Sequence, residues 1–266
     1  IITGAGKALL SDGRCGSIGY GIATAYAKEG ANLVITGRNV QKLQKAKAEL
    51  EKLYGVKVLT FSADIAAGAD NEMTAKSVVD AAVAEFGRID VLINNAGILP
   101  KFNKTQNYSI EEIERVMNIN FYSAVYSIKA LLPMILESST PAIINVASSA
   151  ALMALAGTST YSASKAALKS FTESLREDLR GKCYVSVICP GFTKTDIFRN
   201  QDSNTAKGEK MINAISTDCD KMVKMICNGI ANKRELMIFG FDAEFMKIFG
   251  RLTPVQGGRL FSAVMK

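Results

Sequence analysis

The sequence predicts an α/β fold: a doubly wound, seven-stranded parallel sheet with helices on both faces. Short runs of apolar residues alternate along the chain with longer segments whose apolar residues repeat at helical spacing. Strands that are apolar at nearly every position are typical of a parallel sheet covered on both sides. No repeat or low-complexity linker divides the 266 residues. We therefore expect one domain over 1–266, with a C-terminal extension from about residue 240.

The expected elements alternate between strand and helix. The first strand ends at Thr3 and continues into a glycine-containing turn, a polar loop over 7–16 and a helix over 17–28. Further strands are expected at 33–36, 56–62, 89–93, 141–147, 184–189 and 235–239. Further helices are expected at about 40–53, 72–86, 109–136, 158–180 and 196–231, the last with a polar break near 202–204.

A capping box marks the start of one long helix. Ser109 and Glu112 have the S-x-x-E spacing in which each side chain bonds the other residue's backbone N–H. Beyond it, Ile113, Met117 and Phe121 recur at helical spacing. We expect these three side chains to face the core.

The composition excludes several classes of function. The chain has no histidine, so Ser-His-Asp and Cys-His catalysis and His-based metal sites are excluded, and we expect no metal. Its net charge of +7 is dispersed, which suits a phosphate-bearing cofactor or an anionic substrate and does not indicate a nucleic-acid partner. The five cysteines form no C-x-x-C pair. With no membrane span or signal peptide in view, we expect a cytoplasmic protein with reduced thiols.

The turn after the first strand is a candidate pyrophosphate site. Glycines let the backbone approach phosphates, and a helix N-terminus offers free N–H groups at the positive end of its dipole. The candidates are Gly4, Gly6, Gly16 and Gly19. Twelve residues separate Gly4 from Ser17, so no tight G-x-G-x-x-G can be written through them. A flexible surface loop before an ordinary helix is the alternative interpretation.

The end of the second strand favours NADP over NAD. Dinucleotide sites commonly place Asp or Glu there to bond the adenosine ribose. Here the place is taken by Thr36-Gly37-Arg38, and an arginine without a carboxylate suits a 2′-phosphate. Asp64, just past the third strand, is a candidate acceptor for the adenine amino group. A solvated arginine and a loop-capping aspartate are the alternatives.

Polar or glycine-rich turns follow three neighbouring strands. They are residues 94–97 after the fourth strand, Ser148 after the fifth and residues 190–193 after the sixth. Because the carboxyl ends of parallel strands meet at one edge, where open α/β sheets bind ligands, we expect these residues to converge. Asn120 adds a polar group within an apolar helical stripe. Ordinary turns and hydrogen-bonded buried groups are the alternatives.

Tyr161 and Lys165 are the strongest candidates for proton transfer. They lie four residues apart in an expected helix, so both side chains project from one face. An ammonium beside a phenol favours the phenolate and lowers the phenol pKa from about 10. The sequence therefore predicts an acid–base group without histidine.

Together these residues resemble the short-chain dehydrogenase/reductase family, in its compact, Rossmann-like, single-domain branch. The resemblance covers about residues 3–198. It rests on motifs in the family's order and spacing: Thr3-Gly4, Asn94-Asn95-Ala96-Gly97, Asn120, Ser148, Tyr161-x-x-x-Lys165 and Pro190-Gly191. Ser148 lies thirteen residues before Tyr161, as the family places its serine.

The resemblance implies four catalytic residues and a cofactor site. Tyr161 would be the general acid/base, and Lys165 would lower its pKa and hold the nicotinamide ribose. Ser148 would orient the substrate oxygen, and Asn120 would anchor a water in a proton relay through Lys165. The expected NADP(H)-binding residues are Gly4, Ser17, Ile18, Gly19, Arg38, Asp64, Asn94, Ala96, Gly97, Tyr161, Lys165, Pro190, Gly191 and Thr193.

The sequence departs from the family pattern at both ends. The expanded loop leaves Ser17 in place of a glycine, and residues 17–23 resemble enoyl-carrier-protein reductases and some bacterial bile-acid hydroxysteroid dehydrogenases. Enoyl reductases space their Tyr and Lys more widely, which argues against C=C reduction. Beyond Glu244 an apolar segment carries four basic residues and no acid. It would pack locally over the substrate, meet a partner subunit or touch an anionic membrane.

These observations predict an NADP(H)-dependent oxidoreductase that interconverts a carbonyl and a secondary alcohol on a small apolar substrate, with a steroid or bile acid as one candidate. A carrier-protein-linked 3-oxoacyl reductase is a second candidate, favoured by the basic charge. A non-catalytic NADP-sensing protein is a third. By resemblance, we expect a homodimer or homotetramer that pairs through the helices around 109–136 and 158–180.

Overall fold

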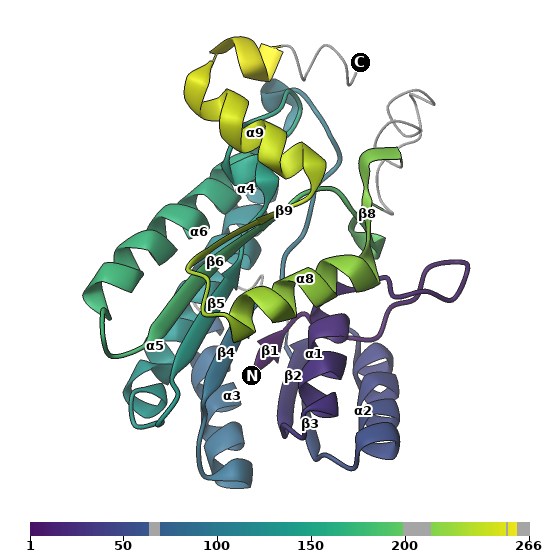
Figure 1. The fold of residues 1–266 in the computed structure, drawn as a ribbon, viewed down its shortest axis with the longest axis vertical. Helices are drawn as coiled ribbons and strands as arrows, with labels where there is room; N and C mark the ends of the chain where they lie inside the picture. Colours follow the sequence, from purple (N-terminus) through teal and green to yellow (C-terminus); the bar gives the residue numbers. More distant parts are fainter. Residues whose placement is uncertain (64–69, 199–213, 254, 260–266) are drawn as a thin grey trace.

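Seven strands form one parallel sheet, as the sequence predicts (Figure 1). The computed structural model describes residues 1–63, 70–198, 214–253 and 255–259. The strands are β1 (Ile2–Thr3), β2 (Leu33–Gly37), β3 (Val58–Ser62), β4 (Val91–Asn94), β5 (Ala142–Val146), β6 (Tyr184–Pro190) and β9 (Leu236–Phe239). Their order is β3-β2-β1-β4-β5-β6-β9. The chain winds outward from β1 and then returns beside it as β4, which makes the topological switch point where open sheets bind ligands.

Helices cover both faces of this sheet. They are α1 (Ile18–Lys28), α2 (Val40–Tyr54), α3 (Asp70–Phe86), α4 (Ile110–Met117), α5 (Ser123–Ile135), α6 (Ser159–Asp178), α8 (Cys219–Ala231) and α9 (Phe241–Leu252). Short 3-10 turns are η1 (Thr105–Asn107), η3 (Ser149–Ala151) and η4 (Asp196–Phe198). A small two-stranded sheet pairs β7 (Thr193–Lys194) with β8 (Thr217–Asp218).

Adjacent residues of one strand serve opposite halves of the core. Ile35, Ile93 and Ile144 pack in the layer formed with α1, α2 and α8. Their neighbours Val34 and Leu92 pack in the layer formed with α3, α5 and α6. Successive side chains of a strand point to opposite faces, so a sheet buried on both sides needs apolar residues at consecutive positions. This is why the strands read as continuous apolar runs.

The long helix expected at 109–136 is interrupted by a π-helical turn, η2 (Asn118–Tyr122). The capping box is present at the start of α4. However, the expected inward residues, Ile113, Met117 and Phe121, are only partly buried. Val116 and Ile119 are buried instead, at 2% and 3% exposure. The wider turn changes the 3.6-residue period only from Asn118 on, so it accounts for Phe121 and not for Ile113 and Met117.

The helix expected over 196–231 is confirmed only for its last part. Residues 199–213 lie outside the described chain. Residues 217–218 are extended because Thr217 pairs with Thr193 in the small sheet, and the Thr217 N–H donates to the Phe192 carbonyl at 2.8 Å. Helix α8 starts only after this strand. A helical period in the sequence could not reveal that pairing.

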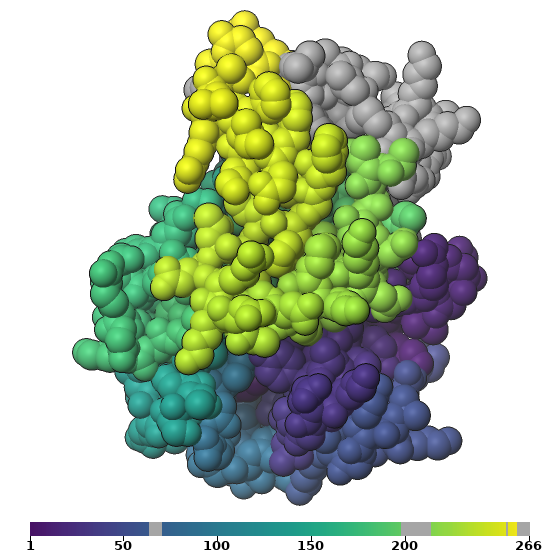
Figure 2. Space-filling model, in the orientation of Figure 1, coloured from purple at the N-terminus to yellow at the C-terminus, as the bar shows by residue number. Residues whose placement is uncertain are grey.

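The C-terminal segment forms helix α9, which closes over the carboxyl end of β6 (Figures 1 and 2). Met246 is fully buried and packs with Met153 and Phe192. The rings of Phe245 and Phe249 stack with centroids 4.1 Å apart. The apolar segment therefore packs against its own chain, which is one of the roles expected for it. Among the described helices, none has the length and apolar character needed to cross a bilayer.

Candidate active site

Two contiguous cavities lie at the carboxyl edge of the sheet. The larger, of about 690 Å³, is lined from the turns after β1, β2 and β4. The smaller, of about 130 Å³, is lined from the turns after β4, β5 and β6. Both are lined by Ile18, Asn95, Gly97, Leu99, Thr195 and Ile197. The larger volume is within the range of cofactor sites.

The turn after β1 is locked to the segment after β4. The Thr3 hydroxyl accepts hydrogen bonds from the Asn95 and Ala96 N–H groups, both at 3.0 Å. Asn95 Nδ2 donates to the Thr3 carbonyl at 3.0 Å and to the Gly4 carbonyl at 3.2 Å. A Cβ on Gly19 would lie 2.4 Å from that Nδ2. Glycine is therefore required there, and Asn95, absent from the predicted site residues, holds the turn in place.

The loop expected over 7–16 is a small hairpin. Leu9 and Cys15 form an antiparallel bridge, and the Gly16 N–H donates to the Ala8 carbonyl at 2.9 Å. The hairpin delivers the chain to Ser17, whose hydroxyl caps α1 by accepting from the Tyr20 N–H at 3.3 Å. The N-terminus of α1 therefore borders the larger cavity, where its free N–H groups suit an anion.

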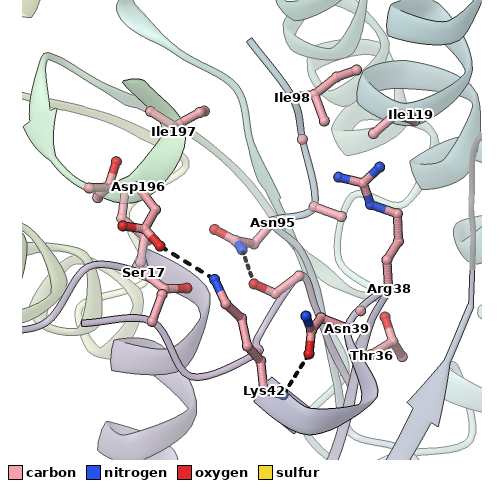
Figure 3. Close-up of a pocket in the computed structure, with 18 of the residues that line it drawn as sticks. Ser17, Thr36, Arg38, Asn39, Lys42, Asn95, Ile98, Ile119, Asp196 and Ile197 are labelled. Atoms are coloured by element: carbon pink, nitrogen blue, oxygen red, sulfur yellow. Dashed lines mark hydrogen bonds and ion pairs between the residues drawn. The ribbon is translucent and has the colours of Figure 1, made fainter. Parts of the chain in front are cut away.

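Two basic side chains enter the larger cavity, Arg38 from the turn after β2 and Lys42 from the first turn of α2. Arg38 is exposed and extends toward Ile98 and Ile119, whereas Lys42 extends toward Asp196 (Figure 3). The Lys42 Nζ lies 3.4 Å from Asp196 Oδ2. Lys42 was not predicted, although it lies in the first turn of the helix after Arg38.

The donor set of the larger cavity fits a phosphate-bearing dinucleotide. Asn39 caps α2 by accepting from the Lys42 N–H at 2.9 Å, so the turn after β2 and the first turn of α2 carry an amide and two cations. The turn after β1 approaches α1 closely at two glycines, Gly4 and Gly19. Asp64, the predicted adenine contact, lies outside the described residues.

Asn94 points into the protein interior and holds strands together. Its Nδ2 donates to Asn145 Oδ1 at 2.9 Å, and Asn145 Nδ2 donates to the Thr172 hydroxyl at 2.9 Å. All three side chains are buried. This chain of hydrogen bonds joins β4, β5 and α6 beneath the site. The neighbouring Ala96 and Gly97 line the larger cavity.

Ser148, Tyr161 and Lys165 meet on the wall of the smaller cavity. Ser148 and Tyr161 both line this cavity. Ser148 accepts from the Ala150 N–H at 3.1 Å, which fixes its position at the start of η3. Lys165 is 3% exposed, and its Nζ donates to the Val146 carbonyl at 2.9 Å. The structure therefore brings these three predicted residues together.

Burial shifts the pKa values of this group. It lowers the pKa of Lys165 to about 8, because a charged ammonium is costly to desolvate. It also raises the pKa of the Tyr161 phenol, and the hydrogen bond from Ser148 opposes this only in part. The sequence led us to expect a lowered phenol pKa. In this structure the direction is the opposite, because desolvation by burial outweighs the lowering effect of Ser148.

Asn120 lies beside this group in the π-helical turn and is 1% exposed. Its Oδ1 accepts from the Ile98 N–H at 2.8 Å, and its Nδ2 donates to the Ile98 carbonyl and the Ser164 hydroxyl, each at 3.0 Å. A Cβ on Gly97 would lie 3.3 Å from Asn120 Oδ1 and 3.2 Å from Lys165 Nζ. Glycine at 97 thus keeps the space between the two polar groups open.

The turn after β6 forms the third wall and is fixed by a buried carboxylate. Pro190, Gly191 and Thr193 line the smaller cavity, and the Thr193 hydroxyl donates to the Gly191 carbonyl at 2.9 Å. Asp242, at the start of α9, is 2% exposed and accepts from the Phe192 N–H at 2.8 Å. Burial raises the pKa of this carboxyl. Sequence reasoning missed Asp242; an acid directly after Phe239-Gly240-Phe241 was the available signal.

The family model for short chain dehydrogenases matches residues 7–206. The chain belongs to the short-chain dehydrogenase family. A 12alpha-hydroxysteroid dehydrogenase from a Clostridium species is 41% identical over 191 residues, 71% of each protein. Ketoacyl reductase HetN from Nostoc is 31% identical over 264 residues, 96% of this chain and 88% of the relative.

Solved structures agree with this assignment. A short-chain dehydrogenase from Sphingobium yanoikuyae in complex with NADPH is 26% identical, covers 98% of this chain and 92% of its own, and has a TM-score of 0.75. This short-chain dehydrogenase is accordingly an oxidoreductase that acts on the CH–OH/C=O pair with a nicotinamide cofactor. The predicted fold and family are confirmed.

Proposed function

We propose that this short-chain dehydrogenase uses NADP(H) to interconvert a carbonyl and a secondary alcohol on an apolar substrate of the hydroxysteroid or bile-acid class. The observation that carries the proposal is that Ser148, Tyr161 and Lys165 line the same wall of the smaller cavity. The apolar side chains of that wall include Leu99, Phe102 and Leu155. A hydrophobic pocket with a few convergent polar groups suits a large apolar ligand with one reacting oxygen.

NADPH would lie across the two cavities and supply the hydride that reduces the substrate carbonyl. The α1 N-terminus and the turn at Gly4 would hold the pyrophosphate. Pro190, Gly191 and Thr193 would border the nicotinamide. Arg38 would hold the 2′-phosphate, because a guanidinium binds phosphate oxygens in a bidentate manner.

Tyr161 and Ser148 would manage the substrate oxygen. Both residues line the smaller cavity, so each hydroxyl would donate a hydrogen bond to a carbonyl oxygen placed between them. As negative charge develops on that oxygen, Tyr161 donates its proton. The raised pKa of Tyr161 keeps the phenol protonated at neutral pH, which suits the reduction direction.

Lys165 and Asn120 would return the proton to Tyr161. Lys165 has a pKa of about 8, so it can gain or lose a proton near neutral pH. Asn120 holds the backbone of Ile98 by a hydrogen bond. The Asn120 side-chain oxygen and the Lys165 ammonium both border the space beside Gly97. A water between the Asn120-bound segment and Lys165 would complete the predicted relay.

A 3-oxoacyl reductase is the second candidate, supported by the net charge of +7 and by the similarity to the ketoacyl reductase from Nostoc. A non-catalytic NADP sensor is the third. The test is NADPH oxidation with matched panels of steroid ketones and 3-oxoacyl thioesters. We expect kcat/KM to favour a steroid ketone by at least about tenfold. Preference for thioesters would select the second candidate, and binding without turnover the third.

We also propose a homodimer or homotetramer built through α4, α5 and α6. Three aromatic rings join η2, which lies between α4 and α5, to α6: the Phe121 ring is 5.1 Å from that of Tyr122 and 5.9 Å from that of Phe171. Tyr122 is 43% exposed. Light scattering of the wild type and of Tyr122→Glu tests this. The assembly formed by the variant should have a lower molar mass than that of the wild type, and an unchanged molar mass would contradict the interface.

A further inference from the structure

Two cysteine side chains face each other beside the larger cavity. Cys15 ends the hairpin before α1, and Cys219 is the first residue of α8, 204 positions later. Their Sγ atoms lie 3.1 Å apart, and neither is in a disulfide. Figure 1 shows the purple hairpin next to the start of α8. The pair takes no part in the proposed reaction.

The elements that carry the two thiols are firmly joined. Helices α1 and α8 lie against each other on the face that Figure 2 shows. They are so close that a Cβ on Gly21 would lie 2.5 Å from Val223 Cγ2. Beside the thiols, Arg14 forms an ion pair with Asp218 at 2.9 Å. These contacts join the hairpin to the start of α8, so the spacing of the thiols is set by rigid neighbours.

The two sulfurs differ in reactivity. A hydrogen bond from the Cys219 thiol lowers the pKa of Cys15 to about 7, although Asp220 opposes the shift. The pKa of Cys219 is raised by the same hydrogen bond and by burial. Cys15 is half-buried, whereas Cys219 is 2% exposed. The thiolate is the nucleophilic form of cysteine, so Cys15 is the sulfur that a small oxidant reaches and that reacts with it first.

We propose that Cys15 and Cys219 are a peroxide-oxidised thiol pair that forms a disulfide between the hairpin and α8. The Cys15 thiolate attacks one peroxide oxygen and the O–O bond breaks, giving a sulfenic acid and hydroxide, which becomes water with the proton that the Cys15 thiol released on ionisation. The Cys219 sulfur then attacks the Cys15 sulfur, loses its thiol proton and displaces hydroxide, which leaves as water. One peroxide is reduced to two waters, and two thiols are oxidised to one disulfide.

Formation of this disulfide needs little movement. A disulfide bond is about 2.05 Å long, so the sulfurs must approach by about 1 Å from their present separation. The hairpin therefore keeps its position, and Gly16, Ser17 and Ile18 stay on the cavity wall. We expect the oxidised protein to melt at a higher temperature and to bind NADPH with a Kd within about threefold of the reduced value.

The test is peptide mapping of the reduced protein after treatment with hydrogen peroxide. We expect loss of two of the five thiols, one cross-linked peptide pair joining Cys15 to Cys219, and reversal by dithiothreitol. Cys15→Ser and Cys219→Ser should abolish the cross-link. Cys183→Ser and Cys227→Ser are matched controls and should retain it. In Cys219→Ser, a sulfenic-acid reagent should label Cys15.

Loss of thiols without the Cys15–Cys219 peptide would overturn the proposal. So would a cross-link that persists in Cys15→Ser, or sulfenic labelling at Cys219 in that variant. Circular dichroism of each variant confirms folding, and Cys15→Ala replaces Cys15→Ser if the serine variant is unfolded. A Kd for NADPH that rises more than about tenfold on oxidation would contradict the retained geometry. The thiol chemistry itself is independent of which cofactor is bound.

Discussion

The two halves of the cleft are built in opposite ways. The half formed by β1, α1 and β2 surrounds a wide cavity with surface charge, and Arg38 in it is exposed. The half formed by β4, β5 and β6 buries its polar groups, with Asn120 at 1% and Lys165 at 3% exposure. A buried polar group is stable only when hydrogen-bonded, whereas an exposed charge is solvated and adaptable. Substitution of an exposed charge in the first half should therefore alter binding and leave the fold intact. Substitution of a buried polar group in the second half should also destabilise the fold.

The largest effect is expected at Tyr161. Tyr161→Phe removes the proton donor and keeps the ring that fills the wall, so kcat for carbonyl reduction should fall by about 10³-fold. Steady-state kinetics measures this fall. Fluorescence titration should give a Kd for NADPH within about threefold of wild type. Residual turnover above about a tenth of wild type would show that another group donates the proton.

The second prediction concerns pH. Alcohol oxidation needs Tyr161 as the phenolate, and burial raises its pKa, so the phenolate fraction grows as the pH rises toward that value. The rate of oxidation should increase about tenfold per unit from about pH 7 to about pH 9, whereas carbonyl reduction stays level only until Lys165, with its pKa of about 8, loses its proton. Initial rates in both directions test this. An oxidation rate that is already level below about pH 8 would indicate a lowered phenol pKa.

A smaller effect is expected in the charged half. Arg38→Ala should raise KM for NADPH by about 10- to 100-fold, the value of a hydrogen-bonded charge, and change KM for NADH by less than about threefold. Lys42→Ala is the matched control, because Lys42 already has Asp196 as a partner. We expect it to have the weaker effect. An equal rise in KM for NADPH and NADH would show that Arg38 contacts a part of the cofactor other than the 2′-phosphate.

The smallest effect is expected at the turn after β6. A Cβ on Gly191 would lie 2.1 Å from Asp242 Oδ1, so Gly191→Ala should lower the free energy of unfolding by about 1–3 kcal/mol. Asp242→Ala should also destabilise, through loss of the bond to the Phe192 N–H. The double variant should lose less free energy of unfolding than the sum of the two single losses, because Asp242→Ala removes the carboxylate that clashes with the new Cβ at residue 191. Strict additivity in urea unfolding would argue against this contact.

The fold and the residues of the site could be predicted from sequence because their signals are local. Consecutive apolar positions predict buried strands, and Ser148, Tyr161 and Lys165 each lie at a strand end or on one helix face. The π-helical turn at Asn120, the bond from Asn95 to the first turn and the carboxylate of Asp242 depend on tertiary contacts. The direction of the Tyr161 pKa was also missed, because burial is a property of the folded chain.

One paired measurement tests most directly whether binding and chemistry are divided between the two halves. It compares kcat and the Kd for NADPH in Tyr161→Phe and Arg38→Ala. We predict opposite patterns: Tyr161→Phe loses kcat and keeps Kd, whereas Arg38→Ala keeps kcat at saturating NADPH and binds it at least about tenfold more weakly. If Arg38→Ala lowers kcat as much as Tyr161→Phe, or if both variants bind NADPH as wild type does, the division is contradicted.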